Sequence, residues 1–379
     1  MYYNMASKKK SCTEERHVGP IPFLHKTCRH EAASKHHPVT AATSLTTGIW
    51  RRYQSRDNRK GRHAIVISPQ SAGRHGIAHP HAAGTLKASL RGIGRMLVRY
   101  PVFDVSYDVA IVFTLGSLIW VINGFFAWLP VQWPSTEFAG EEGLGAGITA
   151  FIGTTVFELG SILLVLEAVN ERRTDCFGWA LEEAMNSYGL LLRPDPDGCA
   201  HHHSVQHSLL TGREAEADRR GARFWEWWPT WSELKTHYFR EIGFLASFTQ
   251  FIAATVFWIS GFTALPAIQD RLSTPAVNGV YWLPQVVGGV GFIISSLLFM
   301  IETQTTWYTP ALTVLGWHIG FWNLIGSIGF TLCGAAGFSS SDAAVYTADL
   351  STFIGSWAFL IGSVIQWYES LDKYPLRIR

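Results

Sequence analysis

The chain has 379 residues, of which 47% are hydrophobic and only 16% are charged, and its net charge is +2. An average soluble domain carries roughly 25% charged residues, so this composition argues against a large water-soluble core with polar surface between its apolar runs. The basic residues are unevenly placed: 18 of the 31 Lys and Arg fall within residues 1–103, and nine more fall within 172–240.

Residues 1–83 are rich in His, Ser, Arg, Gly and Pro, with only scattered apolar residues. A segment of this kind cannot bury enough apolar surface to offset the entropy lost on folding. We therefore expect a disordered, basic, His-rich cytoplasmic tail. The tail contains no apolar core of a signal peptide, so the first hydrophobic helix is expected to direct the chain to the membrane.

Residues 84–103 predict a basic amphipathic helix at the membrane interface. On a helix of 3.6 residues per turn, four cations fall on one side and four apolar residues on the other. The cations are Lys87, Arg91, Arg95 and Arg99, and the apolar residues are Leu86, Leu90, Ile93 and Leu97. This pattern favours binding of residues 84–100 to anionic lipid. A solvated helix turn before the first membrane span is the alternative.

Six apolar stretches predict six transmembrane helices, since about 20 mainly apolar residues cross the core of a bilayer. The stretches lie at roughly 107–129, 146–168, 242–264, 283–302, 315–337 and 350–368. The predicted fold class is therefore all-α, a polytopic membrane protein with the lipid bilayer as its main partner.

All basic residues except Arg271 lie on one side of these helices. The positive-inside rule then places both termini and the loop 172–238 in the cytoplasm, with the protein in the plasma membrane or an endomembrane. That loop is expected to contain a short helix, a Trp-rich interfacial segment at 223–239, and a His-rich stretch at 199–207 that we interpret as a flexible polar loop. We expect no metal, no cofactor and no nucleic-acid partner, and assembly into a homo-oligomer stays open.

Three similar strings end the second, fourth and sixth helices, which indicates an internal repeat. They read FIGTTVFELGSILLVLE from Phe151, VVGGVGFIISSLLFMIE from Val286 and FIGSWAFLIGSVIQWYE from Phe353. The chain is thus expected to form three helical hairpins of equal orientation, at 104–171, 239–304 and 305–373, before a C-terminal tail at 374–379. Parallel repeats of this kind occur in transporters.

Small residues recur seven positions apart in each string, on one seam of a left-handed helix pair, where they let two backbones approach closely. These residues are Gly153, Gly160, Gly288, Ser295, Gly355 and Gly362. Glu167, Glu302 and Glu369 continue the same seam. Two hypotheses remain for these carboxylates. They form an acidic ring in an inner vestibule, or they are interfacial groups that bond helix termini or bases such as Arg172 and Lys373.

Glu158 is a separate candidate because it falls in the middle of a predicted span, where a charge costs roughly 2.5–3.5 kcal/mol. It is either a functional carboxylate at a hydrated cavity or a protonated acid bonded to a neighbour such as Asn123 or Gln250. His318 and Asn323 are the other predicted buried polar residues, and His318 stands near a helix end where a cap is the simpler interpretation.

Three longer stretches resemble a known group of proteins. They are WWPTWSELKTHYFREIGFLASFTQFIAATVFWISGFTALP from Trp227, YWLPQVVGGVGFIISSLLFMIETQ from Tyr281 and WYTPALTVLGWHIGFWNLIGSIGFTLCGAAGF from Trp307. These stretches look like fungal multi-pass integral membrane proteins of unassigned activity. The last hairpin, with GFWNLIGSIGF and FIGSWAFLIGSVIQWYE, is similar to YrhK-like two-helix membrane domains. The resemblance covers about residues 223–373 and implies a helical membrane protein. It implies no catalytic residues.

The sequence contains no nucleophile elbow, zinc-protease motif, P-loop or paired-aspartate motif, so we name no catalytic residues and do not expect an enzyme. Our leading hypothesis is a transporter, channel or sensor for a small solute or ion that uses the buried carboxylates. The alternative is a non-transporting membrane scaffold whose cytoplasmic tail and loop bind partners.

Overall fold

The structure, a computed structural model, describes residues 19–25, 27–32, 49–62, 64–67, 86–171, 174–178, 181, 225–371 and 376–378. Within these ranges, six helices are long and apolar enough to cross a membrane. They are α5 (Val105–Gln132), α6 (Gly147–Val169), α12 (Ile242–Thr263), α15 (Leu283–Glu302), α16 (Leu315–Ala336) and α17 (Asp342–Ser370). The predicted helical membrane fold with six spans is confirmed.

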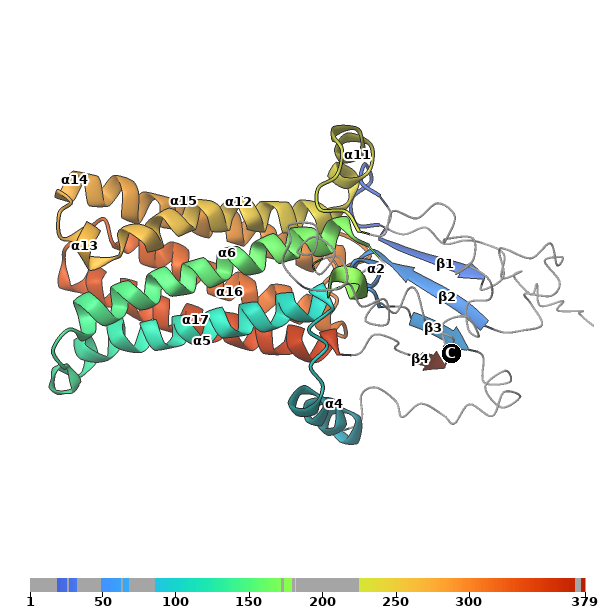
Figure 1. The fold of residues 1–379 in the computed structure, drawn as a ribbon, viewed down its shortest axis with the longest axis horizontal. Coiled ribbons are helices and arrows are strands. Elements are labelled where there is room, and N and C mark those ends of the chain that lie inside the picture. Colours follow the sequence, from blue (N-terminus) through green and yellow to red (C-terminus); the bar gives the residue numbers. More distant parts are fainter. Residues whose placement is uncertain are drawn as a thin grey trace, which may run out of the picture.

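The six helices pack into a closed ring that follows the order of the chain. Each helix contacts the next one, and α17 returns to contact α5. Three consecutive hairpins, α5–α6, α12–α15 and α16–α17, therefore stand side by side in the same orientation (Figure 1). This arrangement gives every helix two neighbours and leaves a central axis onto which one face of each helix points.

The two ends of the ring differ. One end, which we name the loop end, contains the hairpin turns with α13 (Pro266–Gln269), α14 (Thr274–Val277) and the π-turns Glu141–Ala146 and Asn278–Trp282 that lead into α6 and α15. At the opposite end a small sheet lies beyond the bundle, and we name this the sheet end (Figure 1). The chain enters and leaves each hairpin at the sheet end.

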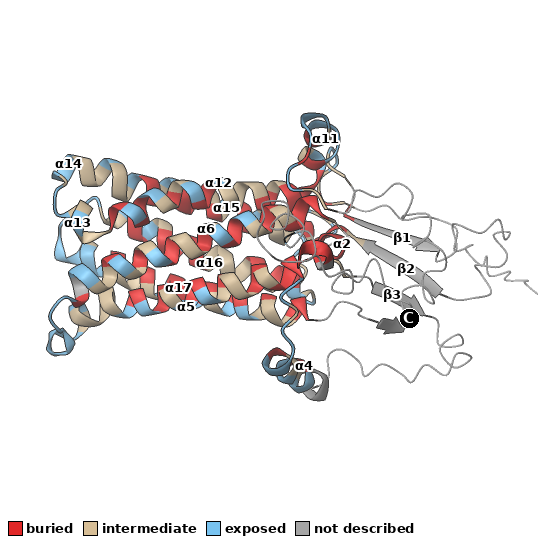
Figure 2. Cartoon of the chain, viewed as in Figure 1, coloured by how far each residue is buried: buried red, intermediate tan, exposed pale blue. Residues whose placement is uncertain are grey.

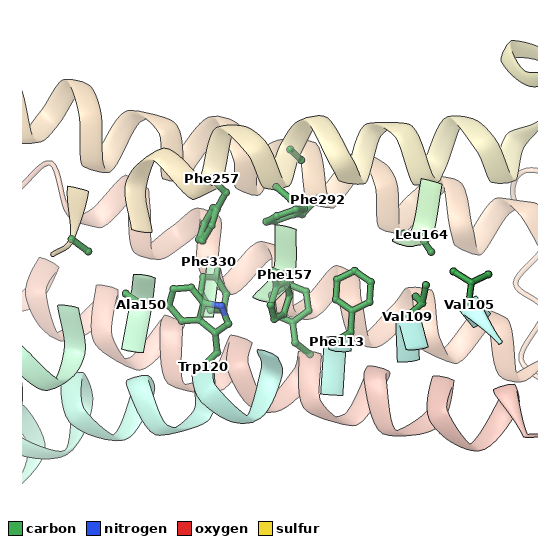
Figure 3. Packing of buried hydrophobic residues seen from close by; sticks show 14 of the residues in the cluster. Val105, Val109, Phe113, Trp120, Ala150, Phe157, Leu164, Phe257, Phe292 and Phe330 are labelled. Carbon is green, nitrogen blue, oxygen red and sulfur yellow. The ribbon is translucent and has the colours of Figure 1, made fainter. Parts of the chain in front are cut away.

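Aromatic side chains fill the axis of the ring (Figure 3). Trp120, Phe257 and Phe330 come from the first helix of each hairpin, and their ring centroids lie 4.7–6.0 Å apart. The next layer comes from the second helix of each hairpin. Phe157 and Phe292 lie toward the sheet end in Figure 3, and the Phe359 ring centroid lies 5.5 Å from that of Phe157. Edge-to-face pairs of this kind contribute about 0.5–1.5 kcal/mol each beyond the area they bury. The two layers close the axis.

The predicted seam residues lie between the two helices of each hairpin, so the close approach expected from their size is present. A Cβ added at Gly153 would lie 2.9 Å from Trp120 Nε1, and one at Gly288 would lie 2.7 Å from Phe257 Cβ. Ser295 uses its hydroxyl instead, which donates to the Ala246 carbonyl at 2.8 Å. Of the remaining seam residues, Gly160 faces Phe113. Gly355 faces Phe330 and Gly326, and Gly362 faces Asn323 and Ile319.

The expectation of a wholly disordered 1–83 tail is wrong for the residues that the structure describes there. Three strands, β1 (Cys28–Ala32), β2 (Ile49–Gln54) and β3 (Ala64–Ile67), form a sheet in the order β1-β2-β3-β4, in which β4 is Leu376–Ile378. β4 pairs with β3 in parallel and is an edge strand of this sheet. Backbone pairing and ion pairs with the bundle stabilise these residues, and an apolar composition is not required. The rest of 1–83 lies outside the described residues.

The predicted amphipathic helix is α4 (Leu86–Val98), which lies beside the sheet end (Figure 1). Its Met96 is buried in a cluster with Tyr107 and Leu371. Leu90, Ile93 and Leu97 face outward and are exposed, as an interfacial helix requires, and binding to lipid stays a prediction.

In the loop before the second hairpin, α11 (Trp231–Thr236) begins with a capping box of Thr230 and Glu233. The His-rich stretch at 199–207 lies outside the described residues. Of the short helix expected at 177–192, the structure describes only Phe177, Gly178 and Leu181, which are helical.

Candidate functional site

Glu167, Glu302 and Glu369 converge at the sheet end of the axis. Each occupies the last turn or two of the second helix of a hairpin, and their relative exposures are 0%, 3% and 1%. Because the three hairpins have the same orientation, the same position in each places its carboxylate toward the centre of the ring. Burial of three unpaired carboxylates is prohibitively costly, so the site must contain cations.

The cations come from residues 55–62, SRDNRKGR, which we name the basic segment. It consists of α2 (Ser55–Arg59) and the turn after it, where Gly61 adopts a φ of +62° that favours glycine. Spacings of three and four residues bring cations onto neighbouring positions of one helical turn. The segment lies between the bundle and the sheet, and α2 is wholly buried (Figure 2).

Arginine side chains of the basic segment pair with all three glutamates. Arg56 Nη2 lies 2.7 Å from Glu369 Oε2, and its Nε donates to Oε1 of the same carboxylate at 3.3 Å. Arg59 bridges two hairpins, since Nη1 lies 3.0 Å from Glu167 Oε2 and Nη2 lies 2.8 Å from Glu302 Oε2. The guanidinium of Arg59 also lies over the Phe299 ring, 5.1 Å from its centroid. A single short segment thus connects all three hairpins.

A second set of contacts surrounds these pairs. Lys60 Nζ lies 3.4 Å from Glu167 Oε1, and Arg62 Nη1 lies 3.1 Å from Glu369 Oε1 and 3.2 Å from Asp57 Oδ1. Four cations of the basic segment therefore face the three glutamates and Asp57. The formal charges of this cluster cancel, so attraction among its members can offset the cost of removing each charge from water.

The first helix of each hairpin provides a matching position at this level. Ser106, Gly243 and Gly316 stand seven residues before Phe113, Gln250 and Asn323, and fourteen before the aromatic layer of Trp120, Phe257 and Phe330. Ser106 donates a hydrogen bond to Glu167. The two glycines leave room for arginine: an added Cβ at Gly316 would lie 2.3 Å from Arg56 Nε, and one at Gly243 would lie 2.7 Å from Arg59 Nε.

A cavity separates the basic segment from the aromatic layers. Its volume, measured over the positions open to the centre of a water molecule, is about 40 Å³, enough for about three waters. Arg56, Arg59 and Lys60 of the basic segment line it, and so do Phe157 and Phe359 of the second aromatic layer. Hydroxyl and amide groups line its wall, from Ser117, Gln250, Ser296, Asn323, Ser363 and Gln366. The axis is therefore polar near the carboxylates and apolar beyond them.

The environment of the basic segment shifts the pKa values of its side chains. Burial opposes the charge of Arg56, but Glu369, Glu302 and Glu167 raise its pKa above the usual value. The pKa of Arg59 is raised in the same way by Glu302 and Glu167 against its burial. Lys60 differs, because burial lowers its pKa to about 8, and attraction to Glu167, 3.4 Å away, and to Glu369 does not offset burial and the two neighbouring arginines.

We expect this shift to make docking of the basic segment depend on pH. Lys60 binds a proton up to pH 10.5 when exposed but only up to about pH 8 when docked, so docking releases a proton between these values and becomes more favourable as the pH rises. The gain from pH 7.5 to 9.5 is about 2 kcal/mol. Melting temperatures of wild type and Lys60→Met in detergent at both pH values check this, since the variant should lack this part of the pH dependence.

The other predicted site residues lie elsewhere. Glu158 faces α12 and does not line the cavity; its Oε1 accepts from Thr255 Oγ1 at 3.0 Å, and its buried Oε2 has no hydrogen-bond partner among the described residues. Asn123 was a suggested partner, but its amide donates to the Ala146 carbonyl at 2.7 Å and to Thr149 Oγ1 at 3.0 Å. His318 contacts the Leu312 carbonyl at 2.7 Å near a helix end.

The structure therefore brings together Asn323, which lines the cavity, and the three seam glutamates, but not Glu158, Asn123 or His318. Arg172 and Lys373, the bases suggested as partners of the glutamates, lie outside the described residues. The basic segment was missed because its composition matches that of the tail around it. A usable signal was present: buried acids require cations, and residues 56–62 contain four of them within seven positions.

No protein-family model, curated protein or solved structure matches this chain.

Proposed function

We propose that the protein is a cation channel or transporter whose inner mouth is closed by its own basic segment. The observation that carries this proposal is the convergence of three equivalent carboxylates on the axis of a closed helical ring. Residues 55–62 bind these carboxylates through Arg56 and Arg59. Guanidinium and ammonium groups occupy the positions that a mobile cation would take. The basic segment is thus a tethered competitor for the permeating ion.

The chemistry of an open state follows from the same residues. Without the basic segment, Glu167, Glu302 and Glu369 would form an acidic ring that attracts cations and repels anions. The amides of Gln250 and Asn323 then offer carbonyl oxygens that replace part of the water around an ion. The aromatic layers beyond the cavity form a second barrier, and passage requires their side chains to move. Polar and acidic groups followed by an apolar constriction are a common arrangement in gated pores.

Flux through liposomes tests this proposal by two independent ways of displacing the segment. Arg59→Gln removes the cation that bridges Glu167 and Glu302, and Gly243→Ala retains every charge but fills the space of Arg59. We expect both variants to raise K⁺ efflux about tenfold or more over wild type, because each one exposes the acidic ring. Adding Glu302→Gln to either variant should reduce the preference for K⁺ over Cl⁻.

Two substitutions serve as matched controls in the same assay. Arg91→Gln removes an exposed arginine of α4, and Glu158→Gln neutralises an acid that lies away from the cavity. Both should leave efflux at the wild-type level. If Arg59→Gln and Gly243→Ala both remain folded and neither exceeds empty vesicles, the ring conducts no cation and the proposal is wrong.

We also infer that the sheet end faces the cytoplasm. All basic residues except Arg271 lie on the sheet-end side of the spans, which supports this orientation by the positive-inside rule. The exposed apolar residues of α4 would then rest on the inner leaflet, and its arginines would meet anionic lipid. The orientation is checked by the side from which trypsin cleaves residues 55–62 of Gly243→Ala in sealed vesicles, since this segment is buried in wild type. Fractionation separates the plasma membrane from endomembranes.

The internal repeat and the kinship with fungal membrane proteins and YrhK-like hairpins are further parts of this proposal. The repeat is supported by equivalent contacts: an aromatic layer from each first helix, another from each second helix, and one paired glutamate per hairpin. Exchange of residues 286–302 for 353–369 within the chain tests it, since an equivalent unit should retain folding where an unrelated apolar string of equal length should not.

A scaffold that does not transport is the second candidate, and the closed aromatic axis favours it. In that case the folded sheet at the sheet end, which combines N-terminal strands with the C-terminal β4, is the surface for partners. Deletion of residues 1–83 cannot separate the two functions, because it would also leave three buried glutamates without cations. The flux assay does separate them, since a scaffold stays silent even when the basic segment is displaced.

A further inference from the structure

A second cluster of chemically active side chains lies beside the basic segment at the sheet end. His25 comes from the N-terminal part of the chain, and His237 and Glu241 come from the 3₁₀ turn Tyr238–Arg240 and its flanks, at the start of α12. One ligand atom from each of these three residues lies within 4.8 Å of the other two. Residues more than 200 positions apart are thus brought to one point.

The cluster is held in place from outside. The backbone N–H of His25 donates to the Arg240 carbonyl at 2.8 Å, which fixes the N-terminal segment against the turn. Glu241 Oε1 lies 2.8 Å from His25 Nδ1, and its Oε2 accepts from Ser55 Oγ at 3.3 Å. The carboxylate is therefore oriented by the basic segment on one side and is open to the two imidazoles on the other.

Accessibility differs among the three residues in a way that suits a metal ion. The Glu241 side chain is only 8% exposed, that of His25 is 35% exposed, and His237 is exposed to solvent. Two ligands are held firmly while the third is free to rotate, and an ion can enter from the aqueous side. The imidazole rings of His25 and His237 already face each other, with centroids 5.5 Å apart.

We propose that His25, His237 and Glu241 bind a divalent transition metal ion of the zinc class. Two imidazole nitrogens and one carboxylate oxygen suit Zn²⁺, Co²⁺ or Ni²⁺, whereas Mg²⁺ and Ca²⁺ require sets of oxygen ligands. Bonds of about 2.0–2.2 Å place the ligand atoms of a tetrahedral zinc site roughly 3.3 Å apart. The His25–Glu241 pair is already closer than this, and rotation of the exposed His237 ring completes the set, with water as the fourth ligand.

The bound ion would fasten the N-terminal segment to the bundle. It replaces one hydrogen bond between His25 and Glu241 with three coordinate bonds, and Ser55, the first residue of the basic segment, contacts the same carboxylate. Occupancy of the site therefore favours the docked basic segment. The site itself does not depend on whether the ring conducts cations, because it is built from the described contacts of His25, His237 and Glu241 alone.

Zinc titration of the purified full-length chain tests the proposal. Other histidines also bind zinc weakly, so the background is a variant in which His201, His202, His203 and His207 are alanine. We expect isothermal titration to show one tight equivalent of Zn²⁺, at least about tenfold weaker in His237→Ala and in Glu241→Gln. His318→Ala is the matched control, because this half-buried histidine bonds the Leu312 carbonyl and is not one of the three cluster residues. The zinc affinity of this variant should equal that of the background.

Cobalt provides a second readout, since Co²⁺ bound to nitrogen and oxygen in a tetrahedral site absorbs visible light, and His237→Ala should lose this band. His237 is exposed, so its substitution does not endanger folding. Zinc should also raise the melting temperature of the background but not that of His237→Ala. Equal zinc affinity and stoichiometry in the background and in His237→Ala would overturn the proposal. A negative flux result would leave it standing, because neither titration measures transport.

Discussion

Arg59→Met should lower the melting temperature of the protein in detergent by roughly 6–10 °C. Arg59 is 2% exposed and pairs with Glu167 and Glu302 at once, so its removal leaves two buried carboxylates short of a cation. Breaking one side of a buried pair costs about 3–5 kcal/mol, and a domain of this size loses about 2 °C per kcal/mol. Thermal unfolding followed by intrinsic tryptophan fluorescence measures the change.

Two companion variants show whether the loss is electrostatic. Arg91→Met removes an exposed arginine, and a surface change of this kind stays within about 0.5 kcal/mol. Arg59→Met with Glu302→Gln should recover part of the lost stability, because one of the unpaired charges is gone. If Arg59→Met and Arg91→Met have the same melting temperature, the ion pairs of Arg59 contribute nothing to the stability of the fold.

Gly243→Ala should release the basic segment by a purely steric route. The new Cβ would lie 2.3 Å from Glu302 Oε1 and 2.7 Å from Arg59 Nε. Glu302 and Arg59 are both buried, and the carboxylate of one pairs with the guanidinium of the other. Neither side chain can therefore withdraw without breaking this ion pair. Overpacking of this kind costs about 1–3 kcal/mol. We expect trypsin to cleave at Arg56 and Arg59 much faster than in wild type, as identified by mass spectrometry of the fragments.

Gly94→Ala is the matched control for this substitution. Gly94 lies within α4, and no atom stands within 4 Å of an added Cβ, so alanine should stabilise the helix by about 0.5–1 kcal/mol. In sealed vesicles, cleavage of Gly243→Ala at residues 55–62 should occur only when trypsin is on the cytoplasmic side. If Gly243→Ala resists trypsin as well as wild type does, the basic segment does not fill the space beside Gly243.

The membrane part of the fold could be predicted because its physics is local. Apolar stretches long enough to cross a bilayer predicted all six helices, and the seven-residue spacing of small residues predicted the packed faces within hairpins. The same spacing placed Glu167, Glu302 and Glu369 at equivalent positions. The ends of the helices were predicted less accurately, since α17 begins at Asp342 and not near residue 350. Polar residues there extend a helix beyond the expected apolar core.

The partners of the glutamates could not be predicted in the same way. Arg56 is separated from Glu369 by 313 positions, and no local pattern reports a contact at that distance. The composition of 1–83 favoured disorder because hydrophobicity measures the ability to form an apolar core, and α2 is stabilised by ion pairs instead. Glu158 shows the opposite case: a mid-helix acid stood out in the sequence, but its bond to Thr255 places it between α6 and α12, away from the cavity.

The position of the basic segment in the chain has a consequence for biosynthesis. Residues 55–62 leave the ribosome before any of the six helices, but their binding site is complete only after α17 has been made, because Glu369 lies in its last turn. Until then, Arg56 and Arg62 lack that carboxylate, and a nascent chain exposes these cations to solvent. Insertion of the arginines therefore marks a fully assembled ring, and a chain truncated within the third hairpin would keep them accessible to quality-control proteases.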